Sequence, residues 1–185
     1  MHYTAKIDFD NRKSNRLNFN DCLLSVDGTD FRIPNHGPAF ASHKYKGKSA
    51  LRYEVALDIE EGDIAWINGG FPAGRWPDEE IFRHGLRSWL DPNERVEADD
   101  GYIGEARLKV KCPASFPNPI EKEAMQARVR TRQETVNKRF KQWGILKQVY
   151  RHDIKTHSVV FRAIAVITQI SLHNGEPLFD VDYND

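Results

Sequence analysis

The sequence predicts an α/β domain with a mixed β-sheet flanked by helices, and the order of its elements supports this. Residues 51–59 alternate apolar and polar side chains, and residues 64–67 follow a turn, so together they indicate an antiparallel hairpin. Residues 120–143 and 158–172 carry apolar side chains at helical spacing. The predicted order favours a layered α/β architecture: a first strand, this hairpin, a helix, a short strand and two further helices.

The first half of the chain is expected to form strands separated by turns. Residues 22–26 are an apolar run that predicts a buried strand, and Asp27-Gly28-Thr29 after it is typical of a turn. Residues 51–59 predict a strand with one buried face, because every second side chain is apolar. Segments rich in Gly, Pro or acidic residues are expected to be loops or turns, and these are residues 35–47, 60–63 and 69–77.

The second half is expected to be mainly helical. Asp78 can cap a helix, and Glu79 and Glu80 suit its first turn. The buried face predicted for this helix consists of Ile81, Phe82, Leu86, Trp89 and Leu90. Residues 96–98 predict a short strand that leads into Asp99-Asp100-Gly101. At 100° per residue, the core stripe of the long helix consists of Met125, Val129, Val136, Phe140 and Trp143.

Length and composition favour one domain with a hydrophobic core. The chain has 185 residues, of which 39% are hydrophobic, so a mainly disordered chain is excluded. We expect an N-terminal arm at residues 1–20, the folded domain at 21–175 and a C-terminal tail at 176–185. No apolar run is long enough to span a membrane, and the polar start is unlike a secretory signal. Two cysteines far apart favour a reducing compartment, the nucleus or the cytoplasm.

The formal net charge of zero hides a strong asymmetry along the chain. Residues 54–105 contain fourteen Asp and Glu against four Lys and Arg, a local charge of −10. Residues 121–151 contain nine Lys and Arg against three Glu, a local charge of +6. A polyanion can therefore bind the basic segment, although the same residues can also be an ordinary solvated helix face.

Three acidic positions are placed where a cation site is often built. Asp27 follows one strand and Asp99 or Asp100 follows another, and neighbouring parallel strands bring such carboxylates together at one edge of a sheet. Glu134 lies on the long helix away from the apolar stripe, beside Arg130 and Lys141. Carboxylates so near to one another repel and require a cation between them. Each also has an ordinary explanation: the aspartates suit turns, and Glu134 suits an ion pair with Lys138.

Five segments, taken together and in order, resemble those of a known family. They are Leu24-Ser25-Val26-Asp27-Gly28-Thr29, Lys44-Tyr45-Lys46-Gly47, residues 72–78, residues 96–102, and residues 130–141 with Glu134-Thr135-Val136-Asn137-Lys138-Arg139-Phe140-Lys141. The set is similar to the endonuclease domain of Harbinger-type DDE transposases and covers about residues 21–175. The resemblance implies a ribonuclease-H-like fold and metal-dependent cutting and joining of DNA.

The same resemblance assigns roles to individual residues. Asp27, Asp99 and Glu134 would be the catalytic triad and would hold two Mg²⁺ or Mn²⁺ ions, while Asp78 matches an acidic position outside the triad. Contacts to the DNA backbone are expected from the basic residues of the long helix, namely Arg128, Arg130, Arg132, Lys138 and Lys141. A separate DNA-binding accessory protein is an expected partner, and a homo-oligomer is compatible with the sequence. We expect no helix-turn-helix domain of the family's usual kind before the first motif, which favours an alternative. The alternative is an inactive, domesticated remnant that binds DNA or a protein.

Overall fold

The computed structural model describes residues 7–13 and 22–175. In this part of the chain, five strands form one sheet in the order β3-β2-β1-β4-β5. Strands β1, β2 and β3 pair antiparallel, whereas β4 and β5 run parallel to β1. The strands are β1 (Cys22–Arg32), β2 (Ala50–Asp58), β3 (Ile64–Pro72), β4 (Arg95–Glu97) and β5 (Val110–Lys111).

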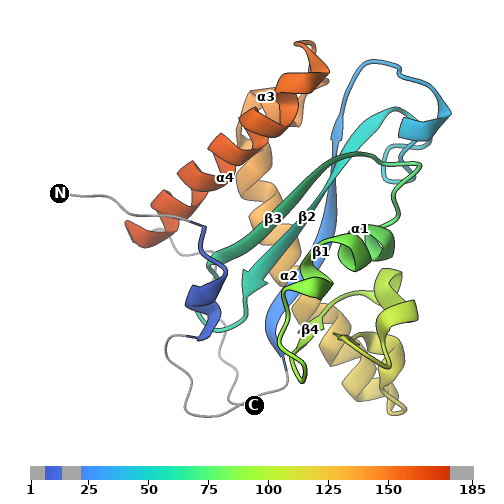
Figure 1. Cartoon of the computed structure of the whole chain (residues 1–185), viewed down its shortest axis with the longest axis vertical. Coiled ribbons are helices and arrows are strands. Elements are labelled where there is room, and N and C mark those ends of the chain that lie inside the picture. The colour runs from blue at the N-terminus through green and yellow to red at the C-terminus, as the bar shows by residue number, and fades with distance from the viewer. Residues whose placement is uncertain (1–6, 14–21, 176–185) are drawn as a thin grey trace.

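Helices cover both faces of this sheet (Figure 1). The helices are α1 (Asp78–His84), α2 (Pro119–Gln142), α3 (Gly144–Lys147) and α4 (His157–His173). Helices α2, α3 and α4 lie on one face and α1 lies on the other, each over its own cluster of buried side chains. The structure confirms the predicted α/β architecture with a mixed sheet, and the arrangement is compatible with a ribonuclease-H-like fold.

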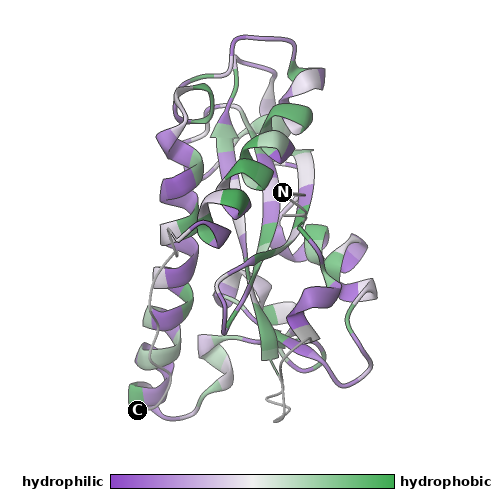
Figure 2. Ribbon diagram, turned by 90° about the vertical axis from the view of Figure 1, so that its left-hand side faces the viewer, coloured by the Kyte–Doolittle hydropathy of each residue, from purple (hydrophilic) through white to green (hydrophobic). Residues whose placement is uncertain are grey.

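Helices α2 and α4 meet the sheet with faces of different chemistry. In α2 the buried residues Met125, Val129, Val136 and Phe140 form the predicted stripe, while most of the helix is polar (Figure 2). Helix α4 is rich in apolar residues, and its Phe161, Ile164 and Ala165 are buried against the same core. Most of each predicted stripe is confirmed, but Trp143 at the end of α2 and Trp89 after α1 are exposed.

Two predicted strand properties were wrong in detail. Asp27-Gly28-Thr29 is not a turn, because β1 continues to Arg32 and pairs with β2 along this whole stretch. Strand β2 is buried on both faces rather than one. Its charged side chains are paired inside the protein, since Arg52 binds Asp30 and Glu54 accepts a hydrogen bond from Trp66.

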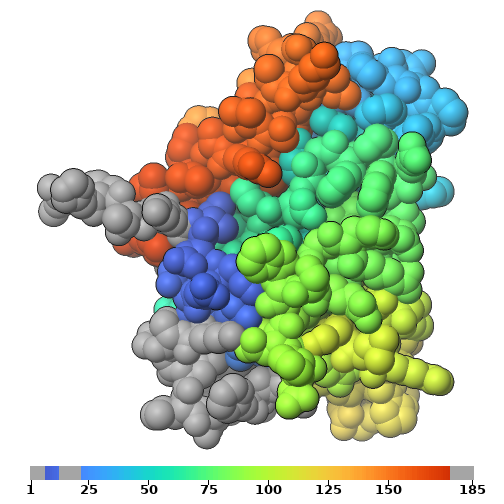
Figure 3. All heavy atoms as spheres, in the orientation of Figure 1, coloured from blue at the N-terminus to red at the C-terminus, as the bar shows by residue number. Residues whose placement is uncertain are grey.

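Part of the predicted N-terminal arm packs against the domain. Arg12, in the short helix η1 (Asp10–Lys13), is buried and its guanidinium makes two hydrogen bonds of 2.8 and 2.9 Å to the carboxylate of Glu94. Phe9 lies edge-on to Trp66 and Trp89. In Figure 3 these dark blue residues lie against the light green segment that leads into β4. The rest of the arm and the tail at 176–185 lie outside the described residues.

Candidate active site

Asp27 and Asp99 come from neighbouring parallel strands in matching register. Ser25 of β1 lies opposite Glu97 of β4, and each aspartate lies two residues further along its own strand direction. Because side chains two residues apart on a strand point to the same face, this register directs both aspartates to the face covered by α2. Their side chains line one cleft of about 300 Å³. The strands are therefore adjacent and parallel, as the sequence argument requires.

The cleft lies between the sheet and the middle of α2. Glu134 lines it together with Asp27 and Asp99, so the fold brings the three predicted carboxylates to one place. The residues around the cleft are Asp27, Lys44, Asp99, Pro113, Gln126, Val129, Arg130, Gln133 and Glu134. Acidic, basic and amide side chains thus face the same small volume.

Asp27 is held in a strongly polar but largely buried position. Only 18% of its side chain is exposed. Its carboxylate accepts a 2.7 Å hydrogen bond from the backbone N–H of Gly28, and Nζ of Lys44 lies 3.9 Å from it. Burial raises the pKa of Asp27 to about 7; Lys44 opposes this rise, while the carboxylates of Asp78 and Asp99 add to it.

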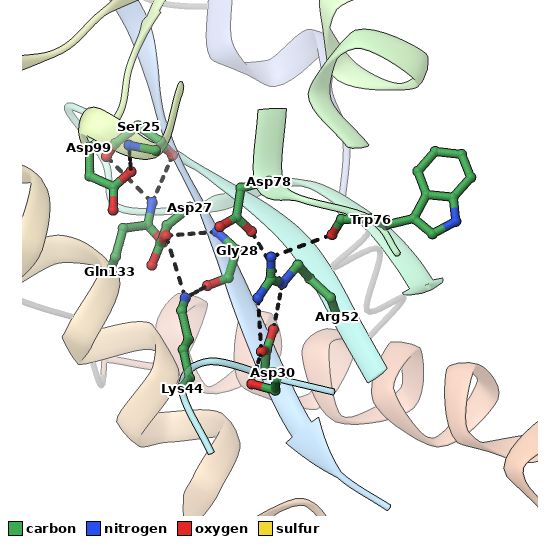
Figure 4. A network of polar contacts seen from close by, with 12 residues as sticks. Ser25, Asp27, Gly28, Asp30, Lys44, Arg52, Trp76, Asp78, Asp99 and Gln133 are labelled. Carbon is green, nitrogen blue, oxygen red and sulfur yellow. Dashed lines mark hydrogen bonds and ion pairs between the residues drawn. The ribbon is translucent and has the colours of Figure 1, made fainter. Parts of the chain in front are cut away.

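Asp78 brings another carboxylate towards Asp27 from the opposite face of β1. It is the first residue of α1 rather than its cap, which is Pro77, so the predicted capping role was wrong. Its Oδ1 is buried, accepts no hydrogen bond from the described residues and lies 3.5 Å from Nε of Arg52 (Figure 4). Burial raises the pKa of Asp78, partly offset by Arg52.

A buried ion pair fixes Arg52 beside this cluster. The guanidinium of Arg52 donates hydrogen bonds of 2.7 and 3.0 Å to the two carboxylate oxygens of Asp30. Ser42 also donates to Asp30. Burial alone would raise the pKa of Asp30, but the hydrogen bonds from Arg52 and Ser42 outweigh it and hold the pKa below its ordinary value. Arg52 is therefore a fixed positive charge beneath Asp78.

Asp99 and Asp100, which spacing alone did not distinguish, have separate positions. Asp99 lines the cleft, and its carboxylate also caps the short helix η4 (Asp100–Glu105) by accepting from the N–H of Gly101 at 2.8 Å. Asp100 accepts a 2.8 Å hydrogen bond from the N–H of Ala114, in the helix η5 (Pro113–Ser115). The geometry thus favours Asp99 as the carboxylate that faces Asp27.

Glu134 lies at the outer side of the cleft. Its side chain is 61% exposed, and Arg130 lies 3.8 Å away as its ion-pair partner, in place of the expected Lys138. Within residues 7–13 and 22–175, no three His, Cys, Asp or Glu side chains form a ready-made metal cluster. The donor set nevertheless fits a hard divalent ion, because Asp27, Asp99 and Glu134 all line the cleft and such ions prefer carboxylate oxygens.

Only some of the basic residues predicted on the long helix remain available to a phosphate backbone. Arg130 lines the cleft, and Arg128 and Lys138 are exposed. Lys141 is half-buried, and its pKa is lowered by burial and by Lys44, which places it near the same site. The role predicted for Arg132 was wrong, because its side chain is 1% exposed and pairs with Glu97 at 2.5 Å.

Among the residues that line the cleft, Lys44 and Gln133 make polar contacts beside Asp27 but received no role from the sequence. Lys44 lies in one of the five recognised segments, and its Nζ donates to the carbonyl oxygen of Gly28 (Figure 4). Gln133 lies four residues after Val129 and three before Val136, so it falls on the buried side of α2. A polar side chain at an apolar position of a helix was the signal that could have identified Gln133.

Comparisons with models of known protein families, with curated proteins and with solved structures found no match for this chain. The sheet topology shows the α/β fold, and the cleft is a candidate site described from its geometry. Both cysteines, Cys22 and Cys112, are buried, and neither forms a disulfide bond within the described residues. Among the helices in the described ranges, none has the length and apolar character to cross a membrane.

Proposed function

We propose that this domain is a metal-dependent DNA endonuclease or strand-transfer domain, similar to that of Harbinger-type DDE transposases. The observation that carries the proposal is the register of β1 and β4, which directs Asp27 and Asp99 to one cleft beside Glu134. Carboxylates from two adjacent parallel strands and a covering helix suit hard divalent ions such as Mg²⁺ or Mn²⁺. The α/β fold with its mixed sheet supports the same reading.

The residues of the cleft have complementary roles in this proposal. Asp27 and Asp99, with Glu134, would hold two Mg²⁺ or Mn²⁺ ions; such ions supply an activated oxygen nucleophile and neutralise charge on the leaving oxygen. Arg130 and Lys44, which line the cleft, would bind the phosphate that is attacked. Arg128, Lys138 and Lys141 would extend this contact along the DNA backbone, without reading its sequence.

Plasmid nicking tests the proposal directly. Supercoiled DNA is incubated with the protein in Mg²⁺ or Mn²⁺, with the chelated reaction as the baseline. We expect nicking by the wild type and its loss in Asp27→Asn and in Asp99→Asn. Asp100→Asn is the matched control, because Asp100 is the neighbouring carboxylate but binds Ala114 outside the cleft. Nicking by Asp27→Asn at the wild-type rate would refute the role of this site.

The exposure of Glu134 and its pairing with Arg130 favour a second candidate, an inactive remnant that binds DNA or a protein. Such a protein would retain the fold and its basic residues but would lack activity. DNA binding by the wild type, with no metal-stimulated nicking under any of the conditions above, would support the remnant. Metal-stimulated nicking that depends on Glu134 would exclude it.

A further inference from the structure

Gln133 is a buried amide in the wall of the proposed metal site. Its residue is only 3% exposed, and it lines the cleft together with Asp27 and Asp99. Its Nε2 donates a 2.9 Å hydrogen bond to the carbonyl oxygen of Ser25 and lies 3.4 Å from the hydroxyl of Ser25 (Figure 4). Gln133 thus joins α2 to β1 two residues before Asp27.

The contact with Ser25 determines which end of the amide faces the carbonyl. A carbonyl oxygen only accepts hydrogen bonds, so the NH₂ group of Gln133 must face it, and the reversed amide would place two acceptors against each other. Oε1 is therefore the amide atom that forms no hydrogen bond with Ser25. It is buried, and none of the described residues donates a hydrogen bond to it.

None of the other residues that line the cleft, including the potential donors Arg130 and Gln126, donates a hydrogen bond to this oxygen. Carboxylates that hold a cation are ionised and only accept hydrogen bonds, so Asp27 and Asp99 supply no donor in that state. Lys44 is held by the carbonyl oxygen of Gly28 and lies beside Asp27. A buried oxygen without a hydrogen-bond donor is energetically unfavourable. Hard divalent cations bind both carboxylate and amide oxygens, so one cation can bind this oxygen together with the carboxylates of Asp27 and Asp99.

We propose that Oε1 of Gln133 is an additional, neutral ligand of the divalent cation held by Asp27 and Asp99. The inference rests on the proposed metal site and deepens it. Helix α2 then contributes two consecutive residues of different character to the cleft. Gln133 lies on the buried side of the cleft and is held there by Ser25, whereas Glu134 lies on the exposed side of the cleft.

Mn²⁺ binding to the full chain, measured by calorimetry, tests the proposal without any activity assay. Gln133→Leu should weaken Mn²⁺ binding roughly tenfold, in the range found when residues around a metal are removed. Gln126→Leu is the matched control, because Gln126 has the same side chain and lines the same cleft but is exposed. Its Mn²⁺ affinity should equal that of the wild type.

Gln133→Met separates ligation from a purely structural role. Methionine keeps the length of the side chain but replaces a hard oxygen by a soft sulfur. We expect weaker Mn²⁺ binding together with a shift in preference towards Cd²⁺, a soft ion. An equal fall in affinity for both metals, or no change for either, would overturn the role of Gln133. A wild type that binds no Mn²⁺ would instead overturn the metal site itself, so the two failures are distinguishable.

Discussion

The carboxylate of Asp78 lies directly against the α-carbon of Gly28. A methyl group at Gly28 would lie 1.6 Å from Oδ1 of Asp78, far inside contact distance. The missing side chain at this position lets the first turn of α1 approach β1 on the face opposite Asp27. The negative charge of Asp78 therefore lies close enough to Asp27 to contribute to the raised pKa of the Asp27 carboxyl.

Gly28→Ala should therefore destabilise the protein by about 1–3 kcal/mol, the usual range for an overpacked interior. The added methyl group forces Asp78 and the start of α1 to move. Unfolding in denaturant should show the loss in an otherwise wild-type background, and a much smaller loss when Asp78 is also changed to Ala. The same loss in both backgrounds would mean that Asp78 is not the obstacle.

Asp27→Asn should stabilise the metal-free protein at neutral and higher pH. Because folding raises the pKa of Asp27 from 3.8 to about 7, the folded state binds the proton more tightly, and the free energy of unfolding falls as pH rises through this window. Asparagine does not ionise, so the variant lacks this fall in the free energy of unfolding. Melting temperatures between pH 4 and 8 should show a flatter profile for the variant. Mn²⁺ should raise the melting temperature of the wild type but leave that of Asp27→Asn unchanged.

Glu54→Gln should give a second, separate change in pH dependence. Glu54 is buried, and this burial raises its pKa from 4.5 to about 8, although Trp66 donates a hydrogen bond to it. Its contribution to stability is therefore present at low pH and is lost as pH rises from about 4.5 to about 8. Glutamine keeps an acceptor for Trp66 and removes the ionisation. A melting profile identical to that of the wild type would show that Glu54 does not ionise in this range.

DNA binding should depend on a few phosphate contacts of α2 and fall steeply with salt. If about four phosphates are neutralised, the logarithm of the binding constant falls with the logarithm of salt concentration at a slope of roughly −3.6. Changing Arg130 and Lys141 to Ala should make the slope shallower by about 2. Filter binding or anisotropy at several salt concentrations measures this. Tight binding to one sequence with an unchanged slope in the double variant would place the DNA site elsewhere.

The order of the longer strands and helices could be predicted because each carries its own periodicity, whereas the two-residue strand β5 and the short helix α3 were not predicted. The pairing of charged residues inside the sheet could not be predicted from the sequence. Arg52 and Glu54 look like the solvent face of β2, but both are buried and form hydrogen bonds with Asp30 and Trp66 on the neighbouring strands. Polarity along one strand does not reveal a partner on the next, so the sequence could not show that both faces are covered.

The sequence indicated the three candidate carboxylates that line the cleft, but not how they and the residues around them are held. Asp27 was expected to lie in a turn, yet it lies within a continuous strand, and only the register of Ser25 with Glu97 shows why Asp99 accompanies it. Arg132 looked like its basic neighbours on α2, although three-dimensional packing places it against Glu97. A helix sequence gives the angle of each side chain but not the depth to which its face is covered.

The pairing of Arg12 with Glu94 has a practical consequence for anyone who expresses this domain. Glu94 is buried immediately before β4, the strand that leads to Asp99, and two hydrogen bonds from Arg12 balance its charge. A recombinant fragment trimmed to begin at residue 22 would leave this carboxylate without its guanidinium partner, and Trp66 and Trp89 without Phe9. Fragment boundaries intended for crystallisation or assays should therefore retain residues 7–13.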